Sequence, residues 1–165
     1  TITVDTANLA GQSVTATVSI GGVDPSCTGT TASCTTSVKA PPPDSVKFDE
    51  YGNIRFNDEK ARLDNYAIQL QNDPGAQGYI IAYGGRRGAA GEALARGERA
   101  KNYLVNTRGI DAGRLFVVDG GYREELTVEL WIVPTGATPP TASPTVEASE
   151  VQIVRPRARR RRGDE

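Results

Sequence analysis

The stretch that decides the fold is "YIIAYGGRRGAAGEALARGERAKNYL", residues 79–104. Its apolar beginning predicts a strand in the middle of a sheet, because an exposed edge strand would alternate with polar residues. Residues 89–108 predict a helix that stops at Gly109, the residue type that most often follows a helix. Many proteins hold an anionic or polar ligand between a strand, a glycine-rich loop and a helix. The loop is therefore the first candidate site, and it contains Arg86 and Arg87.

The glycines of this loop do not match the common nucleotide-binding motifs. A dinucleotide fingerprint needs Gly-x-Gly-x-x-Gly, but Gly84, Gly85 and Gly88 have another spacing, and Tyr83 stands where the first glycine should be. A P-loop needs Gly-Lys-Ser/Thr at the helix entrance, which is absent. Two interpretations remain: the backbone amides and the two arginines hold a carboxylate, or the loop is a turn whose arginines are solvated. The sequence alone slightly favours the second.

The segments around this stretch predict an α+β domain. Residues 46–56 contain an opening strand and a turn, and a helix is expected from its N-cap Asn57 to a stop at Pro74. Two further strands are expected at 114–118 and 126–133. The order βαβαββ corresponds to a two-layer sandwich in which two helices lie on one mixed sheet.

The last predicted strand carries two residues with specific expectations. Leu130 and Ile132 share one face of the strand, so Trp131 points to the opposite face and is expected to make a contact there. Glu129 is expected to pair with a basic residue of a neighbouring strand.

Composition divides the chain into five parts. Residues 1–40 alternate Thr and Ser with apolar residues, which indicates a β-rich extension or the end of an immunoglobulin-like module. The proline-rich residues 41–45 are expected to be a spacer, and residues 46–134 the compact domain. Residues 135–150 have the Pro/Thr/Ser composition of a linker, and residues 151–165 form a disordered-looking, arginine-rich tail. The tail begins with "VQIV", which is suited to pairing with a sheet edge.

The net charge of −1 hides an uneven distribution. Six arginines and two acids lie in the last eleven residues, so the rest of the chain is acidic. An acidic body with a basic tail is not typical of a general nucleic-acid-binding protein. The tail is expected to be solvated, or to contact an anionic membrane surface, a nucleic acid or an acidic protein face. The arginines expected to make such contacts are Arg157, Arg159, Arg160, Arg161 and Arg162.

Three residue counts limit the chemistry and the compartment. The chain has no His, which removes the commonest general base and the usual partner of a nucleophile. We therefore expect no catalytic residue, no metal site and no cofactor. Cys27 and Cys34 lie among Pro, Gly, Ser and Thr, which favours a disulfide in an oxidising compartment over two unrelated thiols. The sequence starts at Thr1 and has no Met, which is typical of a processed product or a fragment.

Several motifs in a fixed order carry a family resemblance. "FNDEKARLDNYAIQLQNDP" (56–74) is followed by "YIIAYGG" (79–85), "YLVNTRGIDAGRL" (103–115) and "TVEL" (127–130). With these motifs, residues 46–134 resemble the OmpA-like C-terminal domain, the peptidoglycan-associated module of Gram-negative envelopes. Each motif is weak alone, but the order and spacing make the set fairly specific. The resemblance implies a non-catalytic domain that binds peptidoglycan.

The resemblance also implies a ligand site, from which this chain departs. In the family, an Asp at the end of the central strand binds the ammonium of the peptidoglycan diamino acid; here Gly85 follows Gly84 at that position. An Arg on the second helix meets the carboxylate of the same diamino acid. The spacing to "YL" places Arg96 there, which we prefer, and the Arg-Ala dipeptide places Arg99. The degenerate ligand site is expected to consist of Tyr83, Gly84, Gly85, Arg86, Arg87, Arg96 and Arg99.

Two functions follow from the resemblance and the departure. The favoured hypothesis is a non-catalytic structural or interaction domain, an accessory subunit of a larger envelope or membrane-associated assembly. The alternative is a peptidoglycan-binding module that tethers an outer-membrane or periplasmic protein to the cell wall. Either implies an exported protein of the periplasm, outer membrane or cell surface of a Gram-negative-type bacterium. The expected partners are other envelope proteins, peptidoglycan and, through the tail, an anionic membrane surface.

Overall fold

The computed structural model describes residues 2–22, 24, 26 and 29–154. The chain forms two compact units, Thr1–Pro42 and Pro43–Glu165. The boundary between them falls in the proline-rich stretch predicted as a spacer. Cys27 and the tail arginines lie outside the described residues, so the predicted disulfide and the predicted tail contacts stay predictions.

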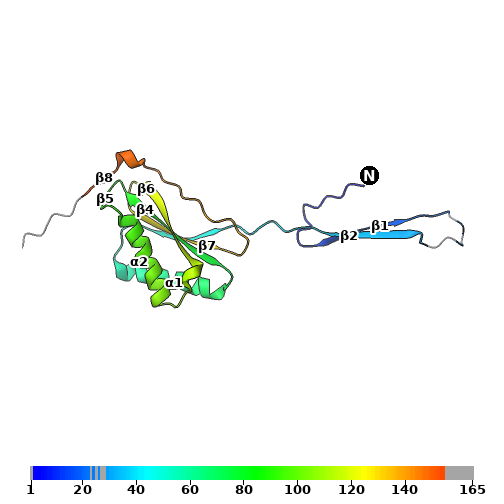
Figure 1. Ribbon diagram of the computed structural model, residues 1–165, viewed down its shortest axis with the longest axis horizontal. Coiled ribbons are helices and arrows are strands. Elements are labelled where there is room, and N and C mark those ends of the chain that lie inside the picture. Colours follow the sequence, from blue (N-terminus) through cyan, green and yellow to red (C-terminus); the bar gives the residue numbers. More distant parts are fainter. Residues whose placement is uncertain (1, 23, 25, 27–28, 155–165) are drawn as a thin grey trace, which may run out of the picture. The chain divides into compact units, whose positions relative to one another are not determined.

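The first unit contains one antiparallel hairpin of strands β1 (Ser13–Ser19) and β2 (Thr31–Ser37) (Figure 1). Because side chains alternate along a strand, the register separates two kinds of residue onto the two faces. One face carries Val14, Ala16, Val18, Ala32, Cys34 and Thr36. The other face carries only Ser and Thr, and the hydroxyls of Thr15 and Thr35 lie 2.8 Å apart. Nearly every residue of both strands is exposed to solvent.

The second unit has mixed α+β structure, and its order within residues 46–134 is the predicted βαβαββ with one short extra strand. Its elements are β3 (Val46–Tyr51), α1 (Phe56–Asn72), β4 (Gln77–Gly85), β5 (Arg87–Gly88), α2 (Glu92–Asn106), the 3-10 helix η1 (Ala112–Arg114), β6 (Leu115–Arg123), β7 (Thr127–Val133), the 3-10 helix η2 (Ala148–Glu150) and β8 (Gln152–Ile153).

Four of these strands form one mixed sheet in the order β3-β7-β4-β6. β4 and β6 are parallel, and the other neighbours are antiparallel. The apolar strand β4 therefore lies inside the sheet, as its sequence predicts. Both helices cover one face, where Leu63 and Leu70 of α1 and Leu104 of α2 are fully buried against Ile80 and Leu130 of the sheet (Figure 1).

The helix ends differ from the predicted positions. α1 begins at Phe56 with Arg55 as its N-cap residue, so the predicted N-cap Asn57 lies inside the first turn. α2 begins at Glu92, three residues later than predicted, because Gly91 before it has a φ of 71° that interrupts helical backbone. Gly109, with a φ of 70°, follows the end of α2 as predicted, and its N–H donates to the carbonyl of Val105 at 3.2 Å.

The backbone of α2 lies very close to the sheet at Gly97. A Cβ at this position would be 2.6 Å from Cγ1 of Val117 on β6. We expect Gly97→Ala to lower the free energy of unfolding by about 1–3 kcal/mol, because overpacking outweighs the better helix propensity of Ala. Urea unfolding measures the change. The control is the same substitution in a Val117→Ala background, where the smaller side chain leaves room for the new Cβ. There Gly97→Ala should cost much less than in the wild type. An equal cost in both backgrounds would mean that the strain lies elsewhere.

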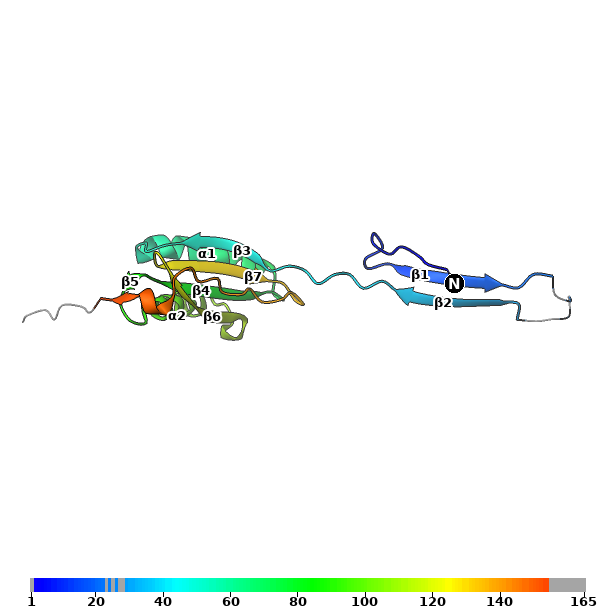
Figure 2. The same cartoon turned by 90° about the horizontal axis from the view of Figure 1, so that it is seen from above.

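Residues 135–150 do not behave as the linker that their composition predicts. Val146 is buried and bridges to Tyr122 of β6, whose carbonyl accepts the N–H groups of Thr145 at 2.9 Å and Val146 at 3.1 Å. β8 then pairs in parallel with β5, which agrees with the edge pairing suggested by "VQIV". We call residues 135–154 the strap. Figure 2 shows it running back along the sheet from the end of β7.

Candidate functional site

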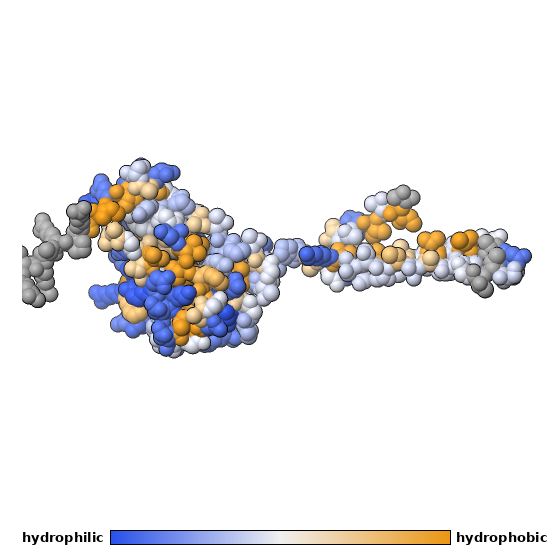
Figure 3. Space-filling model, viewed as in Figure 1, coloured by the Kyte–Doolittle hydropathy of each residue, from blue (hydrophilic) through white to orange (hydrophobic). Residues whose placement is uncertain are grey.

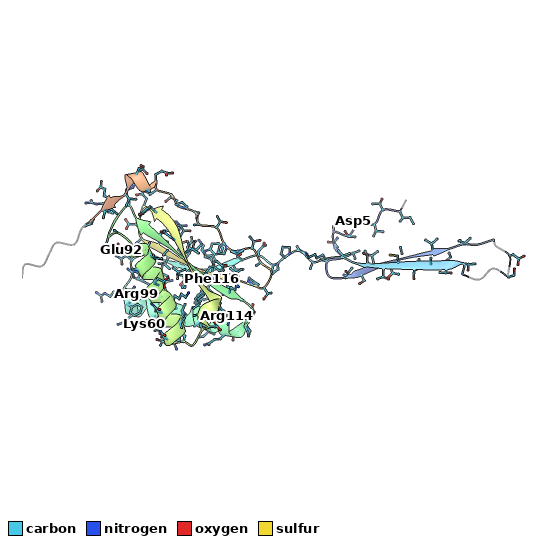
Figure 4. The ribbon with its side chains drawn as sticks, viewed as in Figure 1. Asp5, Lys60, Glu92, Arg99, Arg114 and Phe116 are labelled. Atoms are coloured by element: carbon cyan, nitrogen blue, oxygen red, sulfur yellow. The ribbon has the colours of Figure 1, made fainter. Side chains whose placement is uncertain are left out.

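The glycine-rich loop links the end of β4 to the start of α2, next to the end of the parallel strand β6. Its last residue, Gly91, has the positive φ that glycine adopts without strain. The side chain of Glu92 folds back and its Oε2 accepts the N–H of Ala89 at 3.2 Å. An acid at this place also interacts favourably with the N-terminus of α2. Figure 4 labels Glu92 at this end of the helix.

Arg86, the first arginine of the loop, is engaged within the domain. Its Nε and Nη2 donate to the two carboxylate oxygens of Glu124 at 2.8 and 2.6 Å, and its Nη1 lies 3.7 Å from Oε1 of Glu150 in the strap. The hydrogen bonds from Arg86 lower the pKa of Glu124. The backbone carbonyl of Arg86 also accepts the N–H of Gln152 at 2.8 Å. Arg87 beside it is exposed. The two arginines therefore have different surroundings, and Arg86 is partly neutralised by acids of its own chain.

The two candidate helix arginines turn toward a buried acid between the helices rather than toward the loop. Glu59 of α1 is fully buried; its Oε2 forms an ion pair with Nη2 of Arg99 and lies 3.6 Å from Nη1 of Arg96. Arg96 also donates from Nη1 to the carbonyl of Ile54 at 3.0 Å. Its side chain is only 10% exposed, whereas that of Arg99 is 40% exposed. Both arginines thus join α2 to α1 and to the turn before it.

Arg99 additionally stacks on an aromatic ring. Its guanidinium carbon lies 4.4 Å from the ring centroid of Phe56, and Lys60 lies 4.7 Å from the same ring. Figure 4 labels Arg99 and Lys60 close together on the two helices.

The residues at the end of β4 that were predicted to share a ligand site face different parts of the domain. Tyr83 is fully buried on the sheet face opposite the helices, and its hydroxyl donates to Glu129 at 3.2 Å. Gly84 points the other way, where a Cβ would be 2.9 Å from the ring of Tyr122. At Gly85 a Cβ would be 3.1 Å from the backbone nitrogen of Leu126. An acid at position 85 would therefore press against the backbone before β7.

A small pocket of about 150 Å³ lies beside Gly84 and the start of α2. Two carboxylates line it, Glu92 from the helix and Asp119 from β6. Oδ1 of Asp119 accepts the N–H of Gly121 at 2.9 Å. Tyr122 forms another wall. None of the predicted arginines is among its lining residues, so the part of the site that faces this pocket is acidic and not basic as expected.

Sequence reasoning missed both carboxylates for identifiable reasons. Glu92 lies inside the predicted helix and received no role of its own. An acid in the first turn of a helix, next to a glycine-rich loop, is nevertheless a local indication of a charged group at the helix N-terminus. Asp119 lies 34 positions after Gly85, and only the parallel pairing of β4 with β6 brings it there. Parallel strands end at the same edge of a sheet, which is where α/β folds usually place ligands. The approach of Asp119 to the loop follows from that pairing.

A second polar cluster occupies the sheet face opposite the helices. Glu129 is buried there, and it accepts hydrogen bonds from Nη2 of Arg123 at 2.9 Å and from Nε1 of Trp131 at 3.0 Å. Lys47 of β3 lies 3.4 Å from it. The predictions that Glu129 pairs with a neighbouring base and that Trp131 points away from Leu130 are both confirmed.

This cluster also anchors the strap. Arg123 stacks on the ring of Tyr83 at 3.7 Å and donates to the hydroxyl of Ser143 at 3.0 Å. The N–H of Ser143 donates to the hydroxyl of Tyr83 at 3.2 Å. Among the described residues, no buried side-chain polar atom of this cluster lacks a hydrogen-bond partner. The cluster therefore holds the strap on the sheet and has the character of a structural network.

Within the residues described, no group of three or more acidic, cysteine or histidine side chains is arranged to hold a metal ion. Over the same residues, neither helix is long and apolar enough to cross a membrane. Cys34 lies exposed on β2, opposite Ala16. No known family model matches this chain, and no curated protein matches its sequence.

Proposed function

We propose that this chain is a non-catalytic envelope protein and that residues 46–134 form an interaction domain of OmpA-like fold. It acts as an accessory subunit of a larger envelope or membrane-associated assembly, in the periplasm or at the outer membrane of a Gram-negative-type bacterium. Its partners are other envelope proteins. We further propose that the arginine tail contacts an anionic membrane surface.

One observation favours this proposal over wall binding: three of the four arginines of the predicted ligand site are engaged internally, and only Arg87 is exposed. Arg96 and Arg99 pair with the buried Glu59, and Arg86 pairs with Glu124. Withdrawing Arg96 from Glu59 would leave a buried carboxylate with fewer partners, which is unfavourable. The domain thus keeps these charges for its own stability, and no cation is among the described residues that line the pocket beside Gly84.

The alternative, a module that tethers a protein to peptidoglycan, has one observation in its favour. The pocket beside Gly84 carries two carboxylates, Glu92 and Asp119, and Gly84 is the neighbour of Gly85, the position of the family's ammonium-binding acid. A carboxylate makes strong, charge-assisted hydrogen bonds to an ammonium group. In this alternative Glu92 and Asp119 replace the acid missing at Gly85.

Co-sedimentation of the purified chain with isolated peptidoglycan sacculi separates the two functions. We expect the wild-type chain to stay in the supernatant at physiological salt. Pelleting would overturn the interaction-domain proposal in favour of the tether. In that case the variant Glu92→Gln, Asp119→Asn should lose at least about tenfold in affinity, since two charge-assisted bonds become neutral.

The matched control removes two acids that lie outside the pocket. Asp58 of α1 and Glu98 of α2 are exposed, so Asp58→Asn, Glu98→Gln changes the net charge equally without touching the pocket. If this control and the pocket variant pellet equally, binding is due to overall charge. Arg96→Ala and Arg99→Ala are unsuitable for this experiment, because both arginines support the fold through Glu59.

A further inference from the structure

The two edges of the four-stranded sheet are protected to different degrees. The edge strand β3 has a bulge between Lys47 and Asp49, and these two charges with Glu50 lie along it. Bulges and charges are the usual devices that keep an edge strand from pairing with another chain. The other edge strand, β6, begins with Leu115, Phe116, Val117 and Val118, four apolar residues without charge or proline.

The apolar part of β6 is also regular, and Phe116 within it is exposed. Its pairing with β4 runs without a shift from Leu115 to Asp119, and the irregularity comes only after that. The strap pairs with β6 at Tyr122, beyond this part. Phe116 is 37% exposed and stacks on Tyr79 of β4 with 4.9 Å between ring centroids. Figure 4 labels Phe116 on this strand, and Figure 3 shows apolar surface in the same area.

We propose that the outer edge of β6 pairs antiparallel with the same edge of a second copy of this chain, about a twofold axis at Val117. In this register Phe116 of each copy lies opposite Val118 of the other. Aromatic and β-branched residues form favourable cross-strand pairs, and the twofold axis creates this pair twice. The pairing would cover the exposed ring of Phe116 in both copies and join the two sheets into one.

The charges near this edge fit a second copy. Arg114 would lie opposite Gly120, and Asp119 opposite Leu115, so no like charges face each other directly. Five paired residues extend over only about 17 Å, which corresponds to a small interface and a weak dimer. The dimer should therefore form in a concentration-dependent way. A strand from another protein would not provide the twofold match of Phe116 with Val118.

Sedimentation velocity of the full chain over a wide concentration range tests the proposal. We expect a shift from monomer to dimer, and Phe116→Lys should raise the dissociation constant about tenfold or more, because a lysine on an edge strand opposes pairing. Val46→Lys is the matched control: Val46 is 58% exposed on the protected edge β3, and its variant should dimerise like the wild type.

Four outcomes would overturn the proposal. A chain that is monomeric at every concentration has no such dimer. Equal weakening by Val46→Lys and Phe116→Lys would indicate a general charge effect. A dimer that is lost in Val18→Lys but kept in Phe116→Lys would place the interface on the apolar face of the β1–β2 hairpin. If circular dichroism shows that Phe116→Lys does not fold, Phe116→Thr removes the same cross-strand pair without adding a charge, and an unchanged dissociation constant then overturns the proposal.

Discussion

Replacing Glu59 with alanine is expected to lower the free energy of unfolding by about 3 kcal/mol. This is the lower end of the range found when one member of a buried ion pair is removed. Glu59 is fully buried between the helices and accepts the hydroxyl of Tyr51 at 3.1 Å. It is also the acid toward which Arg96 and Arg99 turn. Without it, the hydroxyl of Tyr51 loses its acceptor, and the nearly buried Arg96 loses its acidic partner and keeps only neutral acceptors such as the carbonyl of Ile54. Arg99 is more exposed and can turn to water, which keeps the loss from being larger.

Urea unfolding of Glu59→Ala measures this change. Asp58→Ala is a close control, because Asp58 is the exposed neighbour in the same helical turn and should change stability by less than about 0.5 kcal/mol. Equal stability of both variants would mean that the acid between the helices is not a structural element. The internal use of the helix arginines, and with it the main support for the proposed function, would then fail.

The second large effect is expected at Glu129, on the other face of the sheet. Glu129→Ala removes the acceptor of Arg123, Trp131 and Tyr83 at once, and should cost about 3 kcal/mol at neutral pH. Exposed Glu50 is the control, since Glu50→Ala removes a surface pair with Lys47 at 2.7 Å and a longer one with Arg123 at 3.9 Å, together worth less than about 1 kcal/mol. A small effect at Glu129 would mean that its partners find other acceptors in the strap.

The loss at Glu129 should depend on pH. Burial raises the pKa of this carboxyl, but the hydrogen bonds from Trp131 and Arg123 and the charges of Arg123 and Lys47 outweigh burial, so its pKa in the folded protein lies below the ordinary value of 4.5. A carboxyl whose pKa is lower in the folded than in the unfolded protein stabilises the fold at pH values above its unfolded-state pKa. This stabilisation is lost as the pH falls through the folded-state pKa. The difference in free energy of unfolding between the wild type and Glu129→Ala should therefore reach its full value at pH 7 and become smaller below about pH 4.5. A constant difference down to pH 3 would contradict this.

Local sequence patterns predicted much of the domain and little of the site. The apolar run before Gly84 predicted a central strand, and the alternation around Trp131 predicted the face on which it lies. Helix ends were predicted less well, because Gly91 interrupts the backbone inside a stretch that otherwise favours a helix. The docking of the strap on the sheet was not predicted, because a Pro/Thr/Ser composition does not show that Val146 is buried and pairs with Tyr122.

The sequence by itself determined the α+β class, the order of the strands and helices and the glycine-rich loop before α2, because these depend on the spacing of apolar residues and on glycine. Only the tertiary structure decided which charges meet. It turned Arg96 toward Glu59, paired Arg86 with Glu124, and brought Asp119 to the loop. The physical reason is that an arginine on a helix can reach several acids, and the choice depends on distances across the chain that no local pattern contains.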